Sequence, residues 1–269
     1  MAIDVGGLVG QRAFVDLHGH TSASFDSLAD PKAVVVAAAT RGLTHIAITD
    51  HDRIEGALRA RDAAPDGLTV IIGEECKTSD GDLICLFLER AVAPGRSALA
   101  TIADVRAQGG LVGIPHPFDR FRGSMGKAGG EWLEELASQV DWIEAYNARL
   151  VGGGNDQAAQ FARTHGLPGV AVSDAHSVLE VADAYCVLRG RPETADGLRA
   201  ALAGPIEIVP GRASYVVRLL TPLAKFVQRT RGNGRIQPGA GSDAAGAPGG
   251  EGDAGRSRAV PLTDGSAHD

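Results

Sequence analysis

The stretch FVDLHGHT at residues 14–21 ends a short apolar run with two histidines that stand two positions apart. Residues at this spacing share one face of an extended strand, so His18 and His20 can both reach one metal ion, while Gly19 leaves the opposite face uncrowded. A histidine pair alone is a weak signal. Its position at the end of an apolar run strengthens the prediction that this strand carries metal ligands at its carboxyl end.

Short apolar, β-branched runs recur along the chain and alternate with segments that carry helical start signals. This alternation is typical of βα units that build a parallel sheet. Roughly seven such units in about 200 residues predict a closed or nearly closed α/β barrel, whose functional sites lie at the carboxyl ends of the strands. The predicted strands are Phe14–His18, His45–Thr49, Thr69–Gly73, Leu83–Leu88, Leu111–Ile114, Asp141–Ala145, Gly169–Val172 and Tyr185–Leu188.

Capping signals mark the predicted helices. Asp30 followed by Pro31 is typical of a helix start, and Gly42 is typical of its end. Asp52 with Glu55 three residues later forms a capping-box pattern, which predicts a second helix. Further helices are expected over residues 98–108, 131–139, 156–165 and 193–203.

The composition favours one catalytic domain, predicted over residues 12–212, because 269 residues with 44% hydrophobic content can bury one sizeable core. A formal net charge of −7 argues against binding to duplex nucleic acid, although bound cations would still admit a small anionic substrate. The cysteines Cys76, Cys85 and Cys186 form no paired framework, which fits a reducing compartment. With neither a signal peptide nor a long apolar span in the sequence, we expect a cytoplasmic protein with no membrane contact.

The C-terminal region changes character after the predicted barrel. Residues 213–230 are expected to form a terminal helical segment packed on the barrel, with a membrane-surface or partner-docking helix as the alternative. From Arg231 to Asp269 the chain has ten glycines in 39 residues and no apolar periodicity. Such a segment buries too little surface to offset its ordering entropy, so a disordered tail is predicted.

Four more motifs place histidine or acidic side chains after predicted strands: TDHD at 49–52, GEE at 73–75, PHP at 115–117 and SDAH at 173–176. In the last motif Asp174 and His176 repeat the spacing of the first histidine pair, and flanking prolines restrict the backbone around His116. Imidazole and carboxylate groups hold Zn²⁺, Mn²⁺ or Fe²⁺. Their recurrence predicts a cluster of two or three divalent ions and favours a metal-dependent hydrolase.

Several of these residues also have a structural interpretation. His51 can cap backbone groups at a turn, and Asp26, in a polar loop, can be a helix cap or a turn residue. Adjacent carboxylates are usually solvated, although near several imidazoles Glu75 can bridge two cations. Asp82 resembles a common turn residue, and His45, at the opposite end of its strand, is interpreted as structural.

Together and in this order, HGHT, TDHD, GEE, PHP and SDAH resemble the PHP family of polymerase-associated and histidinol-phosphatase-type phosphoesterases, over about residues 14–211. The resemblance implies a distorted (β/α)7 TIM-like barrel that hydrolyses phosphate esters at a di- or trinuclear metal site. The stretch EAYNAR at 144–149 also resembles a subgroup signature.

The family pattern also implies a ligand set. It places the first ion on His18, His20, Glu75 and Asp174, the second on the bridging Glu75 and His116, and the third on Asp26, His51 and His176. Many family members have a histidine where Asp82 stands, so the second ion would take a carboxylate ligand or bind weakly. Ser24 and Phe25 before Asp26 are a further departure from the pattern.

The implied mechanism uses a metal-bound water held by Glu75, Asp174 and His176. Binding to the metal lowers the pKa of this water from about 16 towards 7. The expected substrate is a small phosphomonoester, a nucleotide or the end of a short single-stranded oligonucleotide. Basic residues near the ligand loops are candidates for gripping it, with solvated surface charge as the alternative interpretation; these are Arg149, Lys77, Arg122 and Arg120.

Two other functions stay open. An amidohydrolase would cleave a carbon–nitrogen bond in a similar barrel, but no lysine stands at a strand end where a bridging carbamate would be needed, and Glu75 fills that place. A barrel that keeps its metals without turnover, as a scaffold, is the second alternative.

Overall fold

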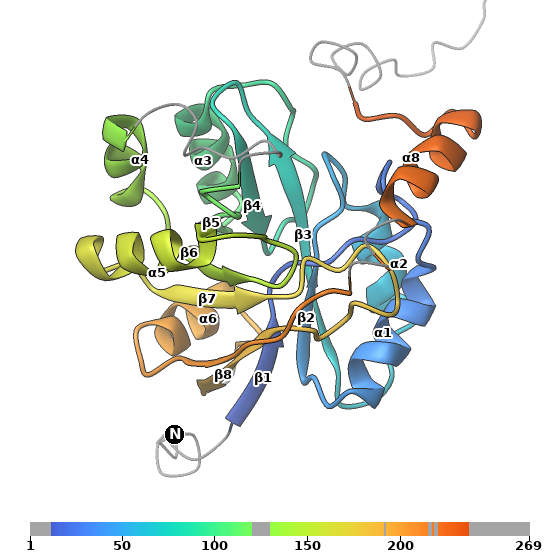
Figure 1. Cartoon of the computed structure of the whole chain (residues 1–269), viewed down its shortest axis with the longest axis horizontal. Helices are drawn as coiled ribbons and strands as arrows, with labels where there is room; N and C mark the ends of the chain where they lie inside the picture. Colours follow the sequence, from blue (N-terminus) through green and yellow to red (C-terminus); the bar gives the residue numbers. More distant parts are fainter. Residues whose placement is uncertain (1–11, 120–129, 191, 215–216, 218–219, 237–269) are drawn as a thin grey trace, which may run out of the picture.

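The computed structural model describes residues 12–119, 130–190, 192–214, 217 and 220–236. Strands and helices alternate along most of this chain (Figure 1). The strands are β1 (Arg12–Asp16), β2 (His45–Ile48), β3 (Thr69–Lys77), β4 (Asp82–Leu86), β5 (Leu111–Ile114), β6 (Trp142–Asn147), β7 (Gly169–Val172), β8 (Tyr185–Arg189) and β9 (Glu207–Val209). The helices are α1 (Pro31–Thr40), α2 (Glu55–Asp62), α3 (Ala98–Ala107), α4 (Gly130–Ala137), α5 (Gly154–His165), α6 (Ala195–Leu202) and α8 (Leu220–Thr230).

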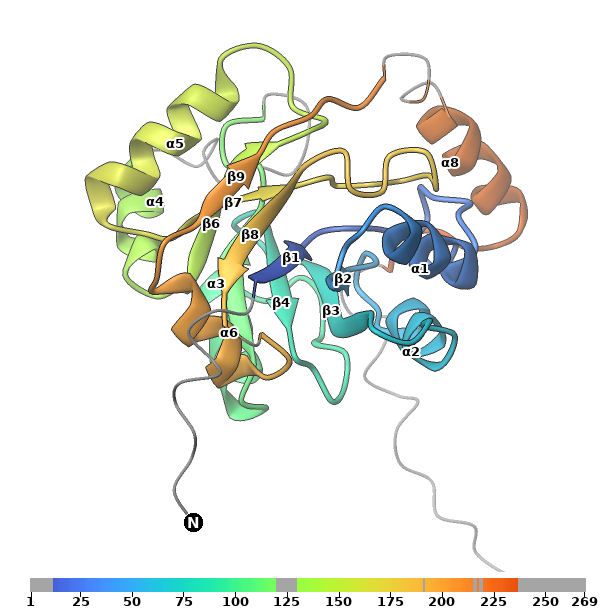
Figure 2. The ribbon, with the colours of Figure 1, turned by 90° about the horizontal axis from the view of Figure 1, so that it is seen from below.

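The strands form one sheet in the order β7-β6-β5-β4-β3-β2-β1-β8-β9. Beyond the carboxyl ends of β1 and β7 the two chain segments meet again, because Gly19 and Ala175 form a parallel bridge. The amide of His20 donates to the Ala175 carbonyl at 2.8 Å, and the amide of Asp174 donates to the His18 carbonyl at 3.0 Å. These bonds bring the first and seventh strands together, so the sheet is a nearly closed, distorted barrel with the helices outside it (Figure 2). The predicted fold class is confirmed.

The expectation of a parallel sheet is wrong for two of the predicted strands, β4 and β8, and β9 is a further strand that the sequence analysis did not predict. β4 runs antiparallel to both β3 and β5, β8 is antiparallel to β1, and β9 is antiparallel to β8. Only residues 78–81 join β3 to β4, whereas a parallel crossover needs roughly a dozen residues or more. In the resulting hairpin Lys77 pairs with Asp82. Asp82 therefore begins its strand at the barrel edge where β3 ends.

A tryptophan packs closely against a glycine between the neighbouring strands β5 and β6. Trp142 on β6 is fully buried, and its indole covers Gly113 on the neighbouring β5. A Cβ atom built at Gly113 would lie 2.1 Å from the ring, so only glycine fits here. Packing at this density makes interiors sensitive to a single added methyl group. All three cysteines are buried free thiols.

The predicted start of α1 is confirmed, because the Asp30 carboxylate accepts hydrogen bonds from the amides of Lys32 and Ala33. The predicted capping box before α2 is wrong. The N-cap of α2 is Ile54, which makes no side-chain cap bond. Asp52 instead has a positive φ of 58° and accepts a 2.7 Å hydrogen bond from the amide of Lys77. Tertiary contacts have therefore taken this carboxylate away from the helix terminus.

Helix α8 lies over the loop between β1 and α1, on one side of the barrel (Figure 1). The buried Gln228 side chain donates to the carbonyls of Ser22, Ser24 and Ser27 at 2.8, 3.0 and 2.7 Å. The Asn233 amide, beyond the helix, donates to the Ala23 carbonyl at 3.1 Å. Residues 231–236, which the sequence assigns to the tail, thus make ordered contacts, and the rest of that tail lies outside the described residues.

No helix within the described ranges is long and apolar enough to cross a membrane.

Candidate metal centre

The predicted ligands gather at one edge of the barrel, on loops and strand ends far apart in sequence. His18 and His20 follow β1, His51 follows β2, His116 follows β5, and Asp174 with His176 follow β7, while Glu75 lies within β3 and Asp26 in the loop before α1. All eight side chains are buried. Backbone φ is positive at His116 (27°) and at Asp174 (53°), a conformation that costs energy and is concentrated at functional sites.

A first group of candidate ligands consists of His18, His20 and Glu75, whose potential ligand atoms lie within 4.8 Å of one another. The Nε2 atoms of the two histidines face each other at 3.0 Å. Oε2 of Glu75 lies 3.3 Å from Nε2 of His18 and 3.4 Å from Nε2 of His20. The carboxylate of Asp174 completes the cluster, with Oδ1 at 3.6 Å from both nitrogens.

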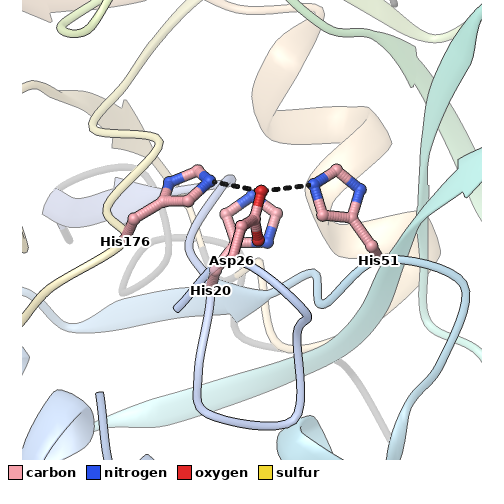
Figure 3. A group of neighbouring side chains, drawn as sticks. All are labelled: His20, Asp26, His51 and His176. Carbon is pink, nitrogen blue, oxygen red and sulfur yellow. Dashed lines mark hydrogen bonds and ion pairs between the residues drawn. The ribbon is translucent and has the colours of Figure 1, made fainter. Parts of the chain in front are cut away.

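A second group consists of His20, Asp26, His51 and His176. Figure 3 shows the imidazoles of His51 and His176 on either side of the Asp26 carboxylate. Oδ2 of Asp26 lies 3.3 Å from the Nε2 atom of each of these rings. Because His20 belongs to both groups, the two groups are adjacent.

Glu75 lies between the groups and reaches a fourth histidine. Its Oε1 atom is 3.2 Å from Nε2 of His116, and its Oε2 atom is 3.4 Å from Nδ1 of His51. A carboxylate can present its two oxygens to two different cations, and here Oε1 faces His116 while Oε2 faces the other histidines; the bridging role of Glu75 stays a prediction. Burial alone would raise its pKa, but the charge of His51 and hydrogen bonds from His116 and His18 hold the pKa well below its usual value.

The histidine pKa values show how strongly the cluster attracts positive charge. Burial disfavours the charged ring of His51, yet the carboxylates of Glu75 and Asp26 outweigh it and raise the pKa to about 9. The pKa of His18 is also raised, because the charges of Glu144 and Asp174 outweigh burial. Burial lowers the pKa of His176 to about 4 despite the nearby Asp26, so this ring keeps a free lone pair.

The donor set fits divalent metal ions. The Nδ1 atoms of His20 and His116 are buried and have no hydrogen-bond partner among the described residues. The nitrogens that face inward meet carboxylate oxygens and other imidazole nitrogens, and each neutral ring has one nitrogen whose lone pair can bind a cation. Neutral imidazole and carboxylate are the common ligands of zinc and related ions. The buried clusters are therefore suited to binding metal, and how many ions bind, and on which residues, stays a prediction.

Glu144 and Asn147 are site residues that the motif analysis did not single out as ligands or supports. The Nδ1–H group of His18 donates to Oε1 of Glu144 at 2.6 Å, which leaves Nε2 of the same ring free for a metal. Oε2 of Glu144 accepts from the backbone amide of His116 and from Nδ2 of Asn147, both at 2.8 Å. Asn147 also donates to Oδ2 of Asp174 at 3.0 Å. The sequence signal that could have identified them is the presence of two polar residues, Glu144 and Asn147, in the otherwise apolar run over residues 142–147.

Two other buried acids support the histidine loops. The Asp50 carboxylate accepts from both the amide and the hydroxyl of Thr21, each at 2.6 Å. Oδ1 of Asp16 accepts from the amide of Ser173 at 3.1 Å, and burial raises the pKa of Asp16 to about 7. These bonds tie the loop after β1 to the loops after β2 and β7.

The remaining predicted residues lie around this centre. Oδ1 of Asp82 accepts a 2.8 Å hydrogen bond from Arg235, and Asp82 belongs to neither ligand group among the described residues. Arg149 donates to Glu180 and to Thr221, both at 2.8 Å. Glu180 in turn accepts from the backbone amide of His176 at 3.0 Å, so these contacts give Arg149 a structural role near the site. Its substrate-binding role stays a prediction, as does that of Lys77, which lies at the end of β3; Arg122 and Arg120 fall outside the described residues.

Comparison with known proteins places this arrangement among relatives. Residues 16–151 match the family model of the PHP domain, and residues 152–204 match that of a PHP-associated region. An uncharacterized protein of Methanocaldococcus jannaschii is 33% identical over 144 residues, which cover 49% of this chain and 81% of that protein. An error-prone DNA polymerase of Mycobacterium tuberculosis is 32% identical over 132 residues, which cover 45% of this chain but 12% of the polymerase.

The fold also resembles that of a crystallised two-domain protein from Bacteroides vulgatus, described as containing a predicted PHP-like metal-dependent phosphoesterase. The two structures superpose with a TM-score of 0.63 over 80% of this chain and 70% of the other, at 17% sequence identity. At this identity the likeness concerns the fold alone.

Proposed function

Since the chain belongs to the PHP domain family, we propose that it is a metal-dependent phosphoesterase that acts on a small phosphomonoester, a nucleotide or the end of a short single-stranded oligonucleotide. The observation that carries the proposal is the pair of buried ligand groups that share His20. Divalent ions held there would activate water near neutral pH and offset the charge of a phosphoryl group. The choice among Zn²⁺, Mn²⁺ and Fe²⁺ is a further proposal, because availability and geometry decide it.

Each side of the site has a defined task in this proposal. One ion would be held by His18, His20, Glu75 and Asp174, and another by Asp26, His51 and His176. His116 would lie next to Oε1 of Glu75. Glu75 keeps a fixed negative charge between the imidazoles because its pKa is held well below the usual value. Glu144 would orient the ring of His18, and Asn147 would orient the Asp174 carboxylate.

The substrate would approach as an anion. Buried carboxylates alone would repel it, so binding depends on cations in the site. Arg149 is linked to the His176 loop through Glu180, and Lys77 lies on the ligand edge of the barrel at the end of β3. A phosphate that enters from this edge would meet these cations next to the ligand groups.

The experiment that tests the proposal measures phosphate release from phosphomonoesters, nucleoside bisphosphates and short 5′-phosphorylated oligonucleotides, with Mn²⁺ or Zn²⁺ added. His20→Ala removes the ligand shared by both groups, and the exposed Gln157→Ala on α5 is the matched control. We expect turnover in the wild type and the control, and a loss of about 10²–10³-fold in His20→Ala, comparable to the loss of one group that stabilises transition-state charge. Absence of turnover across the panel, with metal bound, would instead favour the amidohydrolase or scaffold function.

A further inference from the structure

Arg235 reaches the metal centre from the C-terminal segment. Its Nη2 atom donates to Oδ1 of Asp82 at 2.8 Å, and its Nε atom donates to Oδ2 of Asp52 at 3.1 Å. The side chain is 21% exposed, and Cζ lies 5.8 Å from the centroid of the Phe25 ring. The same ring packs against the imidazole of His51 at 4.9 Å between centroids. The Phe25 ring thus contacts both the guanidinium and His51, a member of the second group of candidate ligands.

The approach of Arg235 is fixed by the residues before it. Gln228 and Asn233 donate to backbone carbonyls of the loop that carries Asp26. Oδ1 of Asn233 also accepts from Nη1 of Arg53 at 2.9 Å. The segment is therefore anchored both on the loop that carries Asp26 and on Arg53, and these contacts position Arg235.

The two carboxylates that Arg235 joins are themselves constrained. Asp52 is buried, and its other oxygen accepts from the amide of Lys77. Asp82 is also buried and begins β4 opposite Lys77. A buried carboxylate needs a nearby positive charge or several hydrogen bonds. Because the guanidinium has donors in a planar fork, one arginine can serve both acids, which a single ammonium group does less well.

We propose that Arg235 takes the place of a metal ion beside Asp82, so that Asp82 is a partner of the guanidinium and not a metal ligand. The centre then holds ions only at its two ligand groups. One group contains His18, His20 and Glu75, with His116 next to Oε1 of Glu75. The other contains Asp26, His51 and His176. A carboxylate at position 82 suits this arrangement, since a neutral imidazole has no charge to pair with arginine. The proposal rests on metal binding by the centre, which the proposed function also requires.

The test counts bound ions per chain in the full-length protein by elemental analysis after saturation with Mn²⁺ or Zn²⁺ and gel filtration. Asp82→Asn keeps the size of the side chain, and we expect it to bind as many ions as the wild type. Arg235→Ala frees Asp82, and we expect it to bind one ion more, a gain that the double variant Arg235→Ala/Asp82→Asn loses. The exposed Arg231→Ala, on the same segment, is the matched control and should bind the wild-type number.

Loss of one ion in Asp82→Asn would overturn the proposal, as would an equal count in a folded Arg235→Ala variant. Thermal unfolding without metal establishes that each variant is folded, and if Arg235→Ala does not fold, the count in Asp82→Asn still decides. A wild-type chain that binds no ion would contradict the proposed function as a whole. A chain that binds ions but loses one in Asp82→Asn would contradict only the assignment of Arg235.

Discussion

Glu144 is the residue whose substitution tests the construction of the metal centre most directly. Its buried carboxylate accepts three hydrogen bonds, from Nδ1 of His18, the amide of His116 and the side chain of Asn147. The bond to His18 holds the proton on Nδ1 and leaves Nε2 with its lone pair towards Glu75. Glu144→Gln keeps the shape of the side chain but replaces one acceptor by an NH₂ donor.

Two effects follow, and their sizes differ. If the oxygen of the substituted side-chain amide faces His116 and Asn147, its NH₂ group faces His18, which must then carry its proton on Nε2, where the metal would bind. Loss of a support that orients a metal-ligating histidine typically costs about 10–100-fold in metal affinity. Glu144→Ala also leaves three buried donors without a partner, so we expect it to destabilise the metal-free protein by about 3–5 kcal/mol.

The assay is metal affinity by competition with a chromophoric chelator, together with urea unfolding in EDTA. Glu74→Gln is the matched control, since Glu74 is the neighbouring buried glutamate and belongs to neither ligand group among the described residues. Burial raises the pKa of Glu74 to about 8, so it is largely protonated at neutral pH and glutamine resembles it. If Glu144→Gln bound metal as tightly as the wild type and the control, the argument that Glu144 fixes the His18 proton would be refuted.

Three further substitutions test packing, the C-terminal segment and titration. Gly113→Ala would place a methyl group 2.1 Å from the indole behind it, so urea unfolding should show a loss of about 3 kcal/mol, while Gly153→Ala, where the space is open, should change little. Gln228→Glu turns a donor towards three carbonyl oxygens into an acceptor, and we expect a loss of about 3 kcal/mol or more in EDTA, against less than about 0.5 kcal/mol for the exposed Gln157→Glu. Burial and a neighbouring carboxylate raise the pKa of Asp183 from 3.8 to about 6, so the folded state binds the proton more tightly and wild-type stability falls as the pH rises through this window. Asp183→Asn should therefore gain stability relative to the wild type between about pH 4 and 7, by less than about 1 kcal/mol because the group is only partly buried, and a constant difference across this range would contradict the assignment.

Most of the barrel was predictable because its strands are short apolar runs with periodic polar neighbours. β2, β5 and β7 lie where the alternation predicts them, and Asp30 caps α1 as expected. The direction of β4 was not predictable from its own residues, since a buried strand has the same apolar pattern whichever way it runs. The short connection over residues 78–81 carried that information, and it outweighs the preference for a parallel βα unit.

The convergence of the candidate ligands was predictable for a related reason. His18, His51, His116 and Asp174 follow strands directly, and the carboxyl ends of neighbouring parallel strands meet at one edge of a barrel. No such rule predicts the residues that hold these side chains in place. The role of Glu144 depends on the ring it meets across the barrel, 126 positions away in sequence, and no local pattern encodes that distance.

The antiparallel direction of β4 and the position of the C-terminal segment together explain how the charge of Asp82 is balanced at the edge of the barrel that carries the candidate ligands. In a parallel strand Asp82, as the first residue, would lie at the opposite edge of the barrel, away from the ligands; the hairpin brings it next to Lys77 instead. That position adds a buried negative charge beside Glu75, which must be neutralised if the edge is to remain packed. Arg235 supplies a positive charge there, and it does so only because Gln228 and Asn233 fix the segment on the loop of Asp26. The carboxylate at position 82, the short β3–β4 turn and the final helix are thus parts of one electrostatic arrangement, although they lie far apart along the chain.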